Sequence, residues 1–141
     1  MSGLAGLGLT IFTGVEEWEI RVTHEFLRWV DTLDGDSYDQ IVSAIDRLAE
    51  VGPGLGRPFV DRVEGSQVHN MKELRPGSSG RSEIRIMFVF DPWRSAILLI
   101  GGDKSGNWSG WDRQAIPRAE ELYQQYLKER QEEAETEEQH S

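Results

Sequence analysis

The stretch EIRIMFVFDPWRSAILLIGG, residues 83–102, decides the fold of this 141-residue chain. Two runs rich in isoleucine, leucine, phenylalanine and valine, 83–90 and 95–101, flank a tight Asp-Pro-Trp-Arg turn at 91–94. Short apolar runs bounded by turn residues are typical of buried strands, and so close a connection is typical of an antiparallel hairpin. We therefore expect the two runs to pair as neighbouring strands of a sheet.

Two further strands are expected before this hairpin. Residues 67–75 also follow a period of two, and the Pro-Gly-Ser-Ser-Gly loop 76–80 separates them from 83–90. Near the N-terminus, residues 18–22 alternate apolar and charged side chains, which is the pattern of a half-buried strand.

Three helices are expected around these strands. A short helix follows from about Thr23, and a second begins at Ser37, where Gln40 completes a capping-box pattern. A final helix is expected from about Pro117, because proline suits the first helical turn. Residues 131–141 are acidic and have no apolar stripe, so this end is expected to be disordered.

These segments predict an α+β domain with the order β-α-α-β-β-β-α, in which helices pack on a small antiparallel sheet. The expected organisation is a flexible, glycine-rich leader at 1–15, one domain at 16–130 and an acidic, disordered tail at 131–141.

The composition narrows the class of protein. Cysteine is absent, which excludes disulfides, thiolate metal sites and cysteine nucleophiles. No run approaches the roughly 20 apolar residues that cross a bilayer, and the leader lacks the basic region of a signal peptide. We therefore expect a cytoplasmic protein.

The charge is unevenly distributed along the chain. The net charge is −10, yet residues 52–118 hold 10 basic and 7 acidic side chains, whereas 1–51 carry −7 and 119–141 carry −6. Phosphates respond to the local field, so a basic middle segment is compatible with a nucleic-acid partner. A chance fluctuation would give a similar excess, and the interpretation depends on which residues the segment contains.

The middle segment combines cations with tryptophans. They are His69, Lys72, Arg75, Arg81, Arg85, Arg94, Lys104, Arg113, Trp108 and Trp111. Cations pair with phosphates and aromatic rings stack on bases, as single-stranded RNA binding requires. Structural roles are the alternative for each: ion pairs for the arginines, a solvated loop for the lysine, and a packed core edge for the tryptophans.

Strand alternation selects among these cations. The isoleucines on either side of Arg85 point to the core, so Arg85 is expected on the opposite, solvent-facing side. By the same rule His69 and Arg75 share a face, while Lys72 falls on the other. Arg75 is therefore favoured over Lys72 as part of a site.

Metal-free RNA cleavage requires three things of such a site. The 2′-hydroxyl must lose a proton, the charge on the phosphorane must be stabilised, and the leaving 5′-oxygen must gain a proton. Arginine suits the second task because its guanidinium binds phosphate oxygens bidentately. A lysine suits either proton step if neighbouring cations depress its pKa.

Other catalytic motifs are incomplete. Residues 101–105, Gly-Gly-Asp-Lys-Ser, end like a Walker A loop but lack its spacing. The sequence has no histidine and carboxylate set with metal-ligand spacing and no Gly-x-Ser-x-Gly elbow. We expect no metal and no cofactor.

The stretch 68–127 resembles the RelE/ParE superfamily of bacterial toxins, and within it the HigB, phage Gp49-like branch. The resemblance is carried in order by Glu73-Leu74-Arg75, Arg85-Ile86, Leu98-Leu99 before Lys104, and Ala119 with Tyr123. It implies a RelE-like fold and the toxin of a type II toxin–antitoxin system, an endoribonuclease that cuts mRNA and inhibits translation.

Together with the residue chemistry, the resemblance implies two groups of site residues. Those expected in catalysis are Arg85, Arg75 and Lys104. Those expected in RNA binding are Trp108, Trp111, Lys72, His69 and Arg113. The family loop usually carries paired lysines and a tyrosine or histidine nearby, whereas this loop has one lysine and two tryptophans.

The resemblance also implies partners and leaves alternatives open. The expected partners are mRNA, free or on the ribosome, and a helix-turn-helix antitoxin of the HigA type. One alternative is a ParE-like toxin that inhibits DNA gyrase. Another is an inactive relative with the same fold that acts only by binding.

Overall fold

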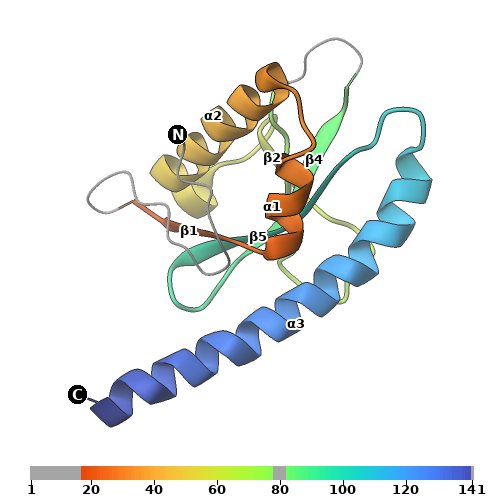
Figure 1. Cartoon of the computed structure of the whole chain (residues 1–141). Coiled ribbons are helices and arrows are strands. Elements are labelled where there is room, and N and C mark those ends of the chain that lie inside the picture. The colour runs from red at the N-terminus through yellow and green to blue at the C-terminus, as the bar shows by residue number, and fades with distance from the viewer. Residues whose placement is uncertain (1–16, 78–81, 141) are drawn as a thin grey trace.

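The computed structural model describes residues 17–77 and 82–140, and within them five strands form one sheet in the order β1-β5-β4-β3-β2 (Figure 1). The elements are β1 (Glu19–Val22), α1 (His24–Val30), α2 (Gly35–Val51), the 3-10 turn η1 (Gly52–Gly54), β2 (Val60–Arg62), β3 (Lys72–Leu74), β4 (Ile84–Phe90), β5 (Ser95–Asp103) and α3 (Trp108–His140). The expected leader at 1–15 lies outside the described residues.

The α+β class and the central β4–β5 hairpin are confirmed, but the sheet differs from the prediction in two ways. It is mixed, because β1 pairs with β5 in parallel, with Ile20 opposite Ala96. It also has an additional strand, β2, in which Val60 is buried opposite Leu74 of β3. Three residues are too few to show a period of two, so the sequence pattern did not reveal β2.

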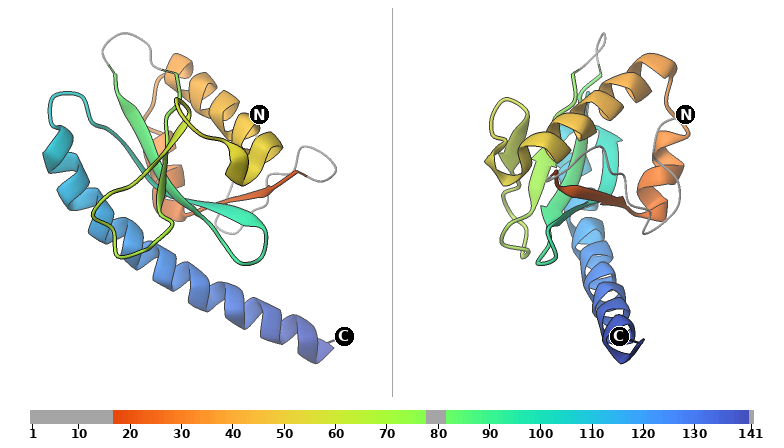
Figure 2. Two further views of the ribbon diagram at one scale, coloured as in Figure 1. Left: turned by 180° about the vertical axis from the view of Figure 1, so that it is seen from behind. Right: turned by 90° about the vertical axis from the view of Figure 1, so that its left-hand side faces the viewer.

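The sheet is covered on both faces, which gives three layers (Figure 2). Apolar residues of α1 and α2 pack on one face, and their core includes Phe26, Ile41, Ile45, Leu48, Ile86 and Phe88. Helix α3 crosses the other face, and that core includes Met87, Val89, Ile97, Leu99, Ala119 and Leu122. Since each face of β4 is buried, its continuous apolar run is the pattern expected of a central strand.

The strand expected at 67–75 is reduced to β3. The preceding residues form a turn, in which the backbone N–H of Met71 donates to the carbonyl of Val68. Met71 itself is buried in the core beneath α3. The apolar spacing of this segment therefore reflects packing against a helix and not a period-two strand.

Helix α3 begins earlier and ends later than the sequence predicted. It starts at Trp108, so Pro117 lies inside it, and it continues through His140, where a disordered tail was expected. Asn107 accommodates the early start because its carbonyl accepts from the backbone N–H of Trp111 and its side chain lies over Gly110. Helix propagation is far easier than nucleation, so a packed helix rich in glutamate and glutamine extends without an apolar stripe.

The second half of α3 is held to the far end of the sheet. The hydroxyl of Tyr126 donates to the carboxylate of Asp91, and burial together with this hydrogen bond raises the pKa of the Tyr126 hydroxyl. Further along, Arg130 lies near Glu19 at 3.5 Å, and Glu133 pairs with Arg21 at 3.3 Å. These contacts fix the direction in which the helix leaves the body of the protein (Figure 1).

A β-bulge in β5 decides which side chains face α3. Met87 pairs with Ile100 and Phe88 pairs with Leu98, so Leu99 is an extra residue with no partner in the register. An extra residue reverses the alternation beyond it. Residues 102 and 104 consequently face α3, where an unbroken alternation would have turned them toward α2.

Candidate active site

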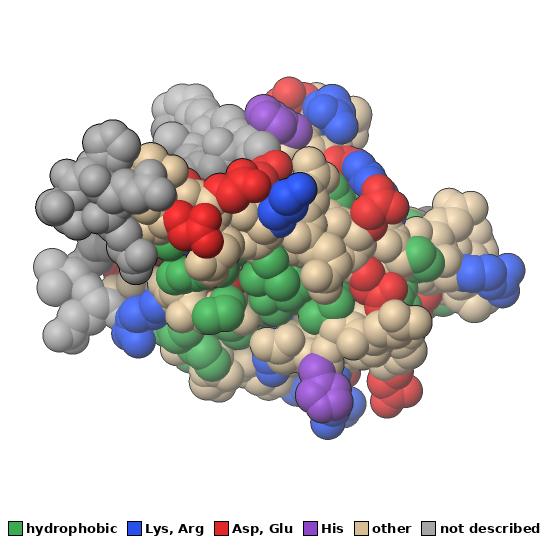
Figure 3. All heavy atoms as spheres, turned by 90° about the horizontal axis from the view of Figure 1, so that it is seen from below, with side chains coloured by type: hydrophobic (Ala, Val, Ile, Leu, Met, Phe, Trp, Pro, Cys, Tyr) green, Lys and Arg blue, Asp and Glu red, His purple; other side chains and the backbone are tan. Residues whose placement is uncertain are grey.

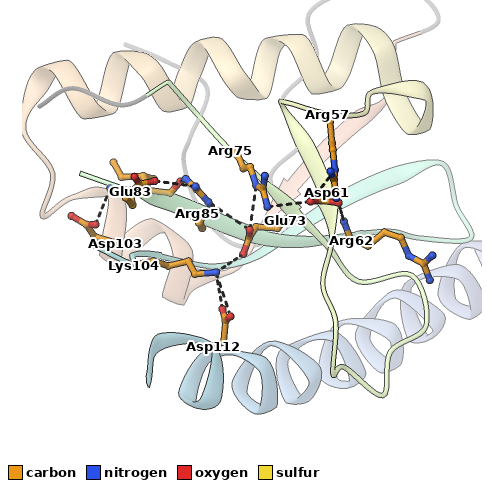
Figure 4. Close-up of polar contacts among 11 residues, drawn as sticks. Arg57, Asp61, Arg62, Glu73, Arg75, Glu83, Arg85, Asp103, Lys104 and Asp112 are labelled. Carbon is orange, nitrogen blue, oxygen red and sulfur yellow. Dashed lines mark hydrogen bonds and ion pairs between the residues drawn. The ribbon is translucent and has the colours of Figure 1, made fainter. Parts of the chain in front are cut away.

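The three cations that the sequence favoured meet around one buried carboxylate (Figure 4). Glu73 of β3 lies 3.4 Å from Nε of Arg75, 3.5 Å from Nε of Arg85 and 3.4 Å from Nζ of Lys104. The strand register explains why these side chains converge. Glu73 pairs with Met87 and Arg85 pairs with Gly102, and these four residues lie on the α3 side of the sheet. The bulge in β5 brings Lys104 to that side as well.

Arg85 is buried, with 9% exposure, and the expectation of a solvent-facing side chain is wrong. Its Nη1 donates to the carbonyl of Ile84 at 2.8 Å, and its Nη2 donates to the carboxylate of Glu83 at 3.0 Å. Its Nε is buried and donates no hydrogen bond within the described residues. The ring of Trp108 covers the guanidinium, with 5.4 Å between ring centroid and Cζ.

Arg75 is the most accessible of the three cations, with 32% of its side chain exposed. Its Nη2 lies 3.2 Å from the carboxylate of Asp61, which Arg57 also contacts at 3.2 Å. A hydrogen bond from the backbone N–H of Arg62, aided by the two arginines, lowers the pKa of Asp61. Arg75 borders two hollows, one beside α2 and one beside the start of α3.

Lys104 is buried between carboxylates and aromatic rings. Besides Glu73, its Nζ contacts Asp112 of α3 at 3.0 Å. It lies 4.8 Å from the ring centroid of Trp108 and 5.7 Å from that of Trp111. The sequence argument gave a lysine either proton step on the condition that cations lie beside it, whereas the groups paired with Lys104 are anions.

The two tryptophans have different environments. Trp108 is 48% exposed, so one side of its ring is available to a ligand. Trp111 is half-buried and packs on Gly102, where an added Cβ would lie 2.0 Å from its indole nitrogen. The packed-core alternative therefore describes Trp111, and base stacking remains a prediction for Trp108.

The remaining predicted site residues are dispersed. His69 lines the hollow beside α3, together with Arg75 and Lys104. Lys72 is opposite Phe88 and so lies on the α2 side of the sheet, as strand alternation predicted. Arg113 is exposed on α3 and lines a separate shallow hollow.

From the sequence, the carboxylates of the site were expected only as possible ion-pair partners of the arginines. Glu73 contacts all three cations, and each cation has a second carboxylate partner: Asp61 for Arg75, Glu83 for Arg85 and Asp112 for Lys104. Asp103 is next to them; burial raises its pKa, but hydrogen bonds from the backbone N–H groups of Glu83 and Ser105 prevail and lower it. Strand alternation alone places residue 73 beside residue 75, and this signal could have identified Glu73.

The carboxylates of the site thus offset the charge of its three cations. Figure 3 shows acidic and basic side chains interspersed around a central apolar area on one face of the molecule. Among the described residues, no group of three or more histidine, aspartate or glutamate side chains is arranged to hold a metal ion. No helix in the same part of the chain has the length and apolar character needed to cross a membrane.

Comparison with known proteins identifies the family. Residues 28–124 match the family described as phage-derived protein Gp49-like, and the chain belongs to this family. Two relatives from Mycobacterium tuberculosis (strain ATCC 25618 / H37Rv), HigB2 and HigB3, carry names that mark them as candidate toxins.

Both relatives share half of the aligned residues with this chain. HigB2 is 50% identical over 99 residues, which cover 70% of this chain and 49% of the relative. HigB3 is 50% identical over 100 residues, which cover 71% of this chain and 85% of the relative. The chain therefore spans about half the length of HigB2 and most of HigB3. The resemblance to the HigB branch is confirmed.

Proposed function

We propose that this protein is the toxin of a type II toxin–antitoxin pair and that it cleaves mRNA without a metal ion. The observation that carries the proposal is the convergence of three cations on one buried carboxylate: Arg85 from β4, Arg75 directly after β3 and Lys104 directly after β5. The similarity to HigB2 and HigB3 supports the toxin class.

Each cation has a role that fits its surroundings. Arg75 and Arg85 hold the scissile phosphate and stabilise the charge that develops on it, because a guanidinium offers paired donors in a fixed plane. Lys104 donates the proton to the leaving 5′-oxygen. Trp108 stacks on a base next to the cleaved bond, since its exposed ring adjoins the cations.

The pairing of every cation with a carboxylate favours a second candidate, a relative that binds a partner but cuts nothing. An incoming phosphate must compete with Glu83 and Asp112 for the cations. Each of these carboxylates has 39% of its side chain exposed, and exposed ion pairs are weak, so the competition is feasible.

Adding the purified protein to a cell-free translation reaction without gyrase is expected to stop protein synthesis. The reporter mRNA is expected to be cut within its coding sequence, which mapping of 5′ ends by primer extension measures. Continued synthesis with intact mRNA would refute the nuclease. Inhibition of purified gyrase in a parallel supercoiling reaction would instead support the ParE-like function.

A free mRNA-cutting enzyme harms its host, so we also propose a helix-turn-helix antitoxin of the HigA type that covers the cations or holds the loop 103–107. Co-expression with the product of the neighbouring gene is expected to give a complex that survives purification. The complex is expected to leave reporter mRNA intact in the cell-free reaction. If the two proteins elute separately, or if the complex cuts as fast as the free protein, this partner is wrong.

A further inference from the structure

We infer that Glu73 is the general base of the reaction, taking the proton from the 2′-hydroxyl, and that it then returns this proton to Lys104. The inference rests on the proposed RNA cleavage. It concerns a residue that neither the sequence motifs nor the family comparison assigns to a chemical step.

The first argument is that no cation of the cluster suits the role of base. Arginine does not lose its proton in proteins, which excludes Arg75 and Arg85. Lys104 contacts carboxylates on two sides, and the ammonium group of a lysine donates hydrogen bonds but accepts none. It is therefore available as the acid, and the proton acceptor must be a different group.

The second argument is the position of the Glu73 carboxylate. It is buried where the three cations converge, so a phosphate bound by them lies next to it. Its Oε1 faces Arg75 and Arg85, and its Oε2 faces Lys104. One carboxylate thus adjoins both the phosphate-binding groups and the acid.

The third argument is that Glu73 is shared among its partners and held tightly by none. Its contacts of 3.4 to 3.5 Å are longer than the roughly 2.7–2.9 Å of a strong charge-assisted hydrogen bond. Lone pairs on the carboxylate consequently remain available to accept from a hydroxyl. By contrast, Asp61 accepts a 2.8 Å hydrogen bond from the backbone N–H of Arg62, and Asp112 lies at the rim on α3.

Every proton released in this step is taken up by another group of the site, and each bond formed is matched by a bond broken. Glu73 takes the 2′-proton, the 2′-oxygen forms a bond to phosphorus, and the bond from phosphorus to the 5′-oxygen breaks. Lys104 gives a proton to that oxygen, which leaves a 2′,3′-cyclic phosphate and a 5′-hydroxyl. The protonated Glu73 then passes its proton to the neutral amine of Lys104 across their 3.4 Å contact, and both groups return to their starting states.

The test compares single-turnover cleavage by Glu73→Gln, Glu73→Asp and the wild type over a range of pH. The substrate is a synthetic labelled RNA that spans the position mapped in the cell-free reaction. Glu73→Gln is expected to be slower by about 100- to 10,000-fold and to lose the fall in rate at acidic pH. Glu73→Asp is expected to keep that fall at a reduced rate, and Glu50→Gln, an exposed change on α2, is expected to match the wild type.

Several other charged groups lie around Glu73, so a second substrate separates their contributions to the rate. Arg75, Arg85 and Lys104 contact Glu73, and Asp61, Glu83, Asp103, Asp112 and His69 surround them. In an RNA with sulfur in place of the leaving 5′-oxygen, departure needs no acid. Lys104→Ala is expected to recover its rate on this RNA, whereas Glu73→Asp and Glu73→Gln are expected to stay slow.

Several results would overturn the assignment. Cleavage by Glu73→Gln within a few-fold of the wild type, or a slow variant with an unchanged acidic fall, excludes Glu73 as the base. If Glu73→Asp recovers its cleavage rate on the sulfur substrate, Glu73 assists the leaving group and is not the base. This measurement tests the assignment even if Glu73→Gln does not fold. Failure of the wild type to cut any RNA is a different result, which refutes the proposed function itself.

Discussion

Replacing Arg85 with alanine is expected to abolish toxicity and slow RNA cleavage by about 100- to 1,000-fold, the usual cost of removing one preorganised donor to a developing oxyanion. The strand β4, packed on both faces, holds Arg85 in place before substrate arrives. Because the side chain is buried and paired with Glu83 and Glu73, the same change is also expected to lower the free energy of unfolding, by about 1–3 kcal/mol.

Arg85→Lys separates the two effects. Lysine keeps the charge beside Glu73 and so preserves most of the stability, but a point charge does not reproduce the paired donors of a guanidinium. We therefore expect a thermal unfolding curve near that of the wild type together with a loss of toxicity in a growth assay. Arg28→Ala on α1, which removes an exposed cation, serves as the control. A folded and fully toxic Arg85→Ala would remove Arg85 from the site, and a fully toxic Arg85→Lys would show that paired donors are not needed there.

Gly102→Val is expected to damage both stability and activity, although valine is a good strand residue. The buried Cα of Gly102 faces the indole of Trp111, and an added Cβ would lie 2.0 Å from the indole nitrogen and 2.6 Å from Cε2. Either the ring or the backbone must shift, and overpacking of this kind costs about 1–3 kcal/mol. Displacing Trp111 also displaces the first turns of α3, which carry Trp108 and Asp112.

The matched change is Gly56→Val, because a Cβ at Gly56 meets nothing within 4 Å. Unfolding in urea is expected to show a lower midpoint for Gly102→Val only, and single-turnover cleavage is expected to fall with it. Equal unfolding midpoints for the two variants would show that Trp111 moves aside without cost. Unchanged cleavage by a destabilised Gly102→Val would show that the start of α3 does not position the site.

The central hairpin was predictable because both of its strands are apolar on both faces, so the pattern was strong. The position of Glu73 beside Arg75 follows from alternation alone. Alternation could not predict that the side chains of β5 change faces at Leu99. Without this bulge, Lys104 would face α2 and would not contact Glu73. Bulges depend on packing across the sheet, which a local pattern does not contain.

The wrong prediction that Arg85 is exposed also came from packing that a local pattern does not contain. Pro117 was interpreted as the start of the last helix, so the face that carries Arg85 was left uncovered. The helix in fact begins at Trp108, and its first turns lie over that face. Local propensity placed the helix start at a proline, whereas packing of Trp111 on Gly102 and of Ala115 in the core placed it earlier.

Helix α3 packs on the sheet along its apolar side, and polar contacts also hold it at two separate places. One is at the site, where Asp112 holds Lys104; the other is at the opposite end of the sheet, where Asp91 and Glu19 hold Tyr126 and Arg130. At about 1.5 Å per residue, these two places are about 21 to 27 Å apart along the helix. A shift of the helix along the sheet would also move Asp112, so the position of Lys104 depends in part on contacts that are remote from it in both sequence and space.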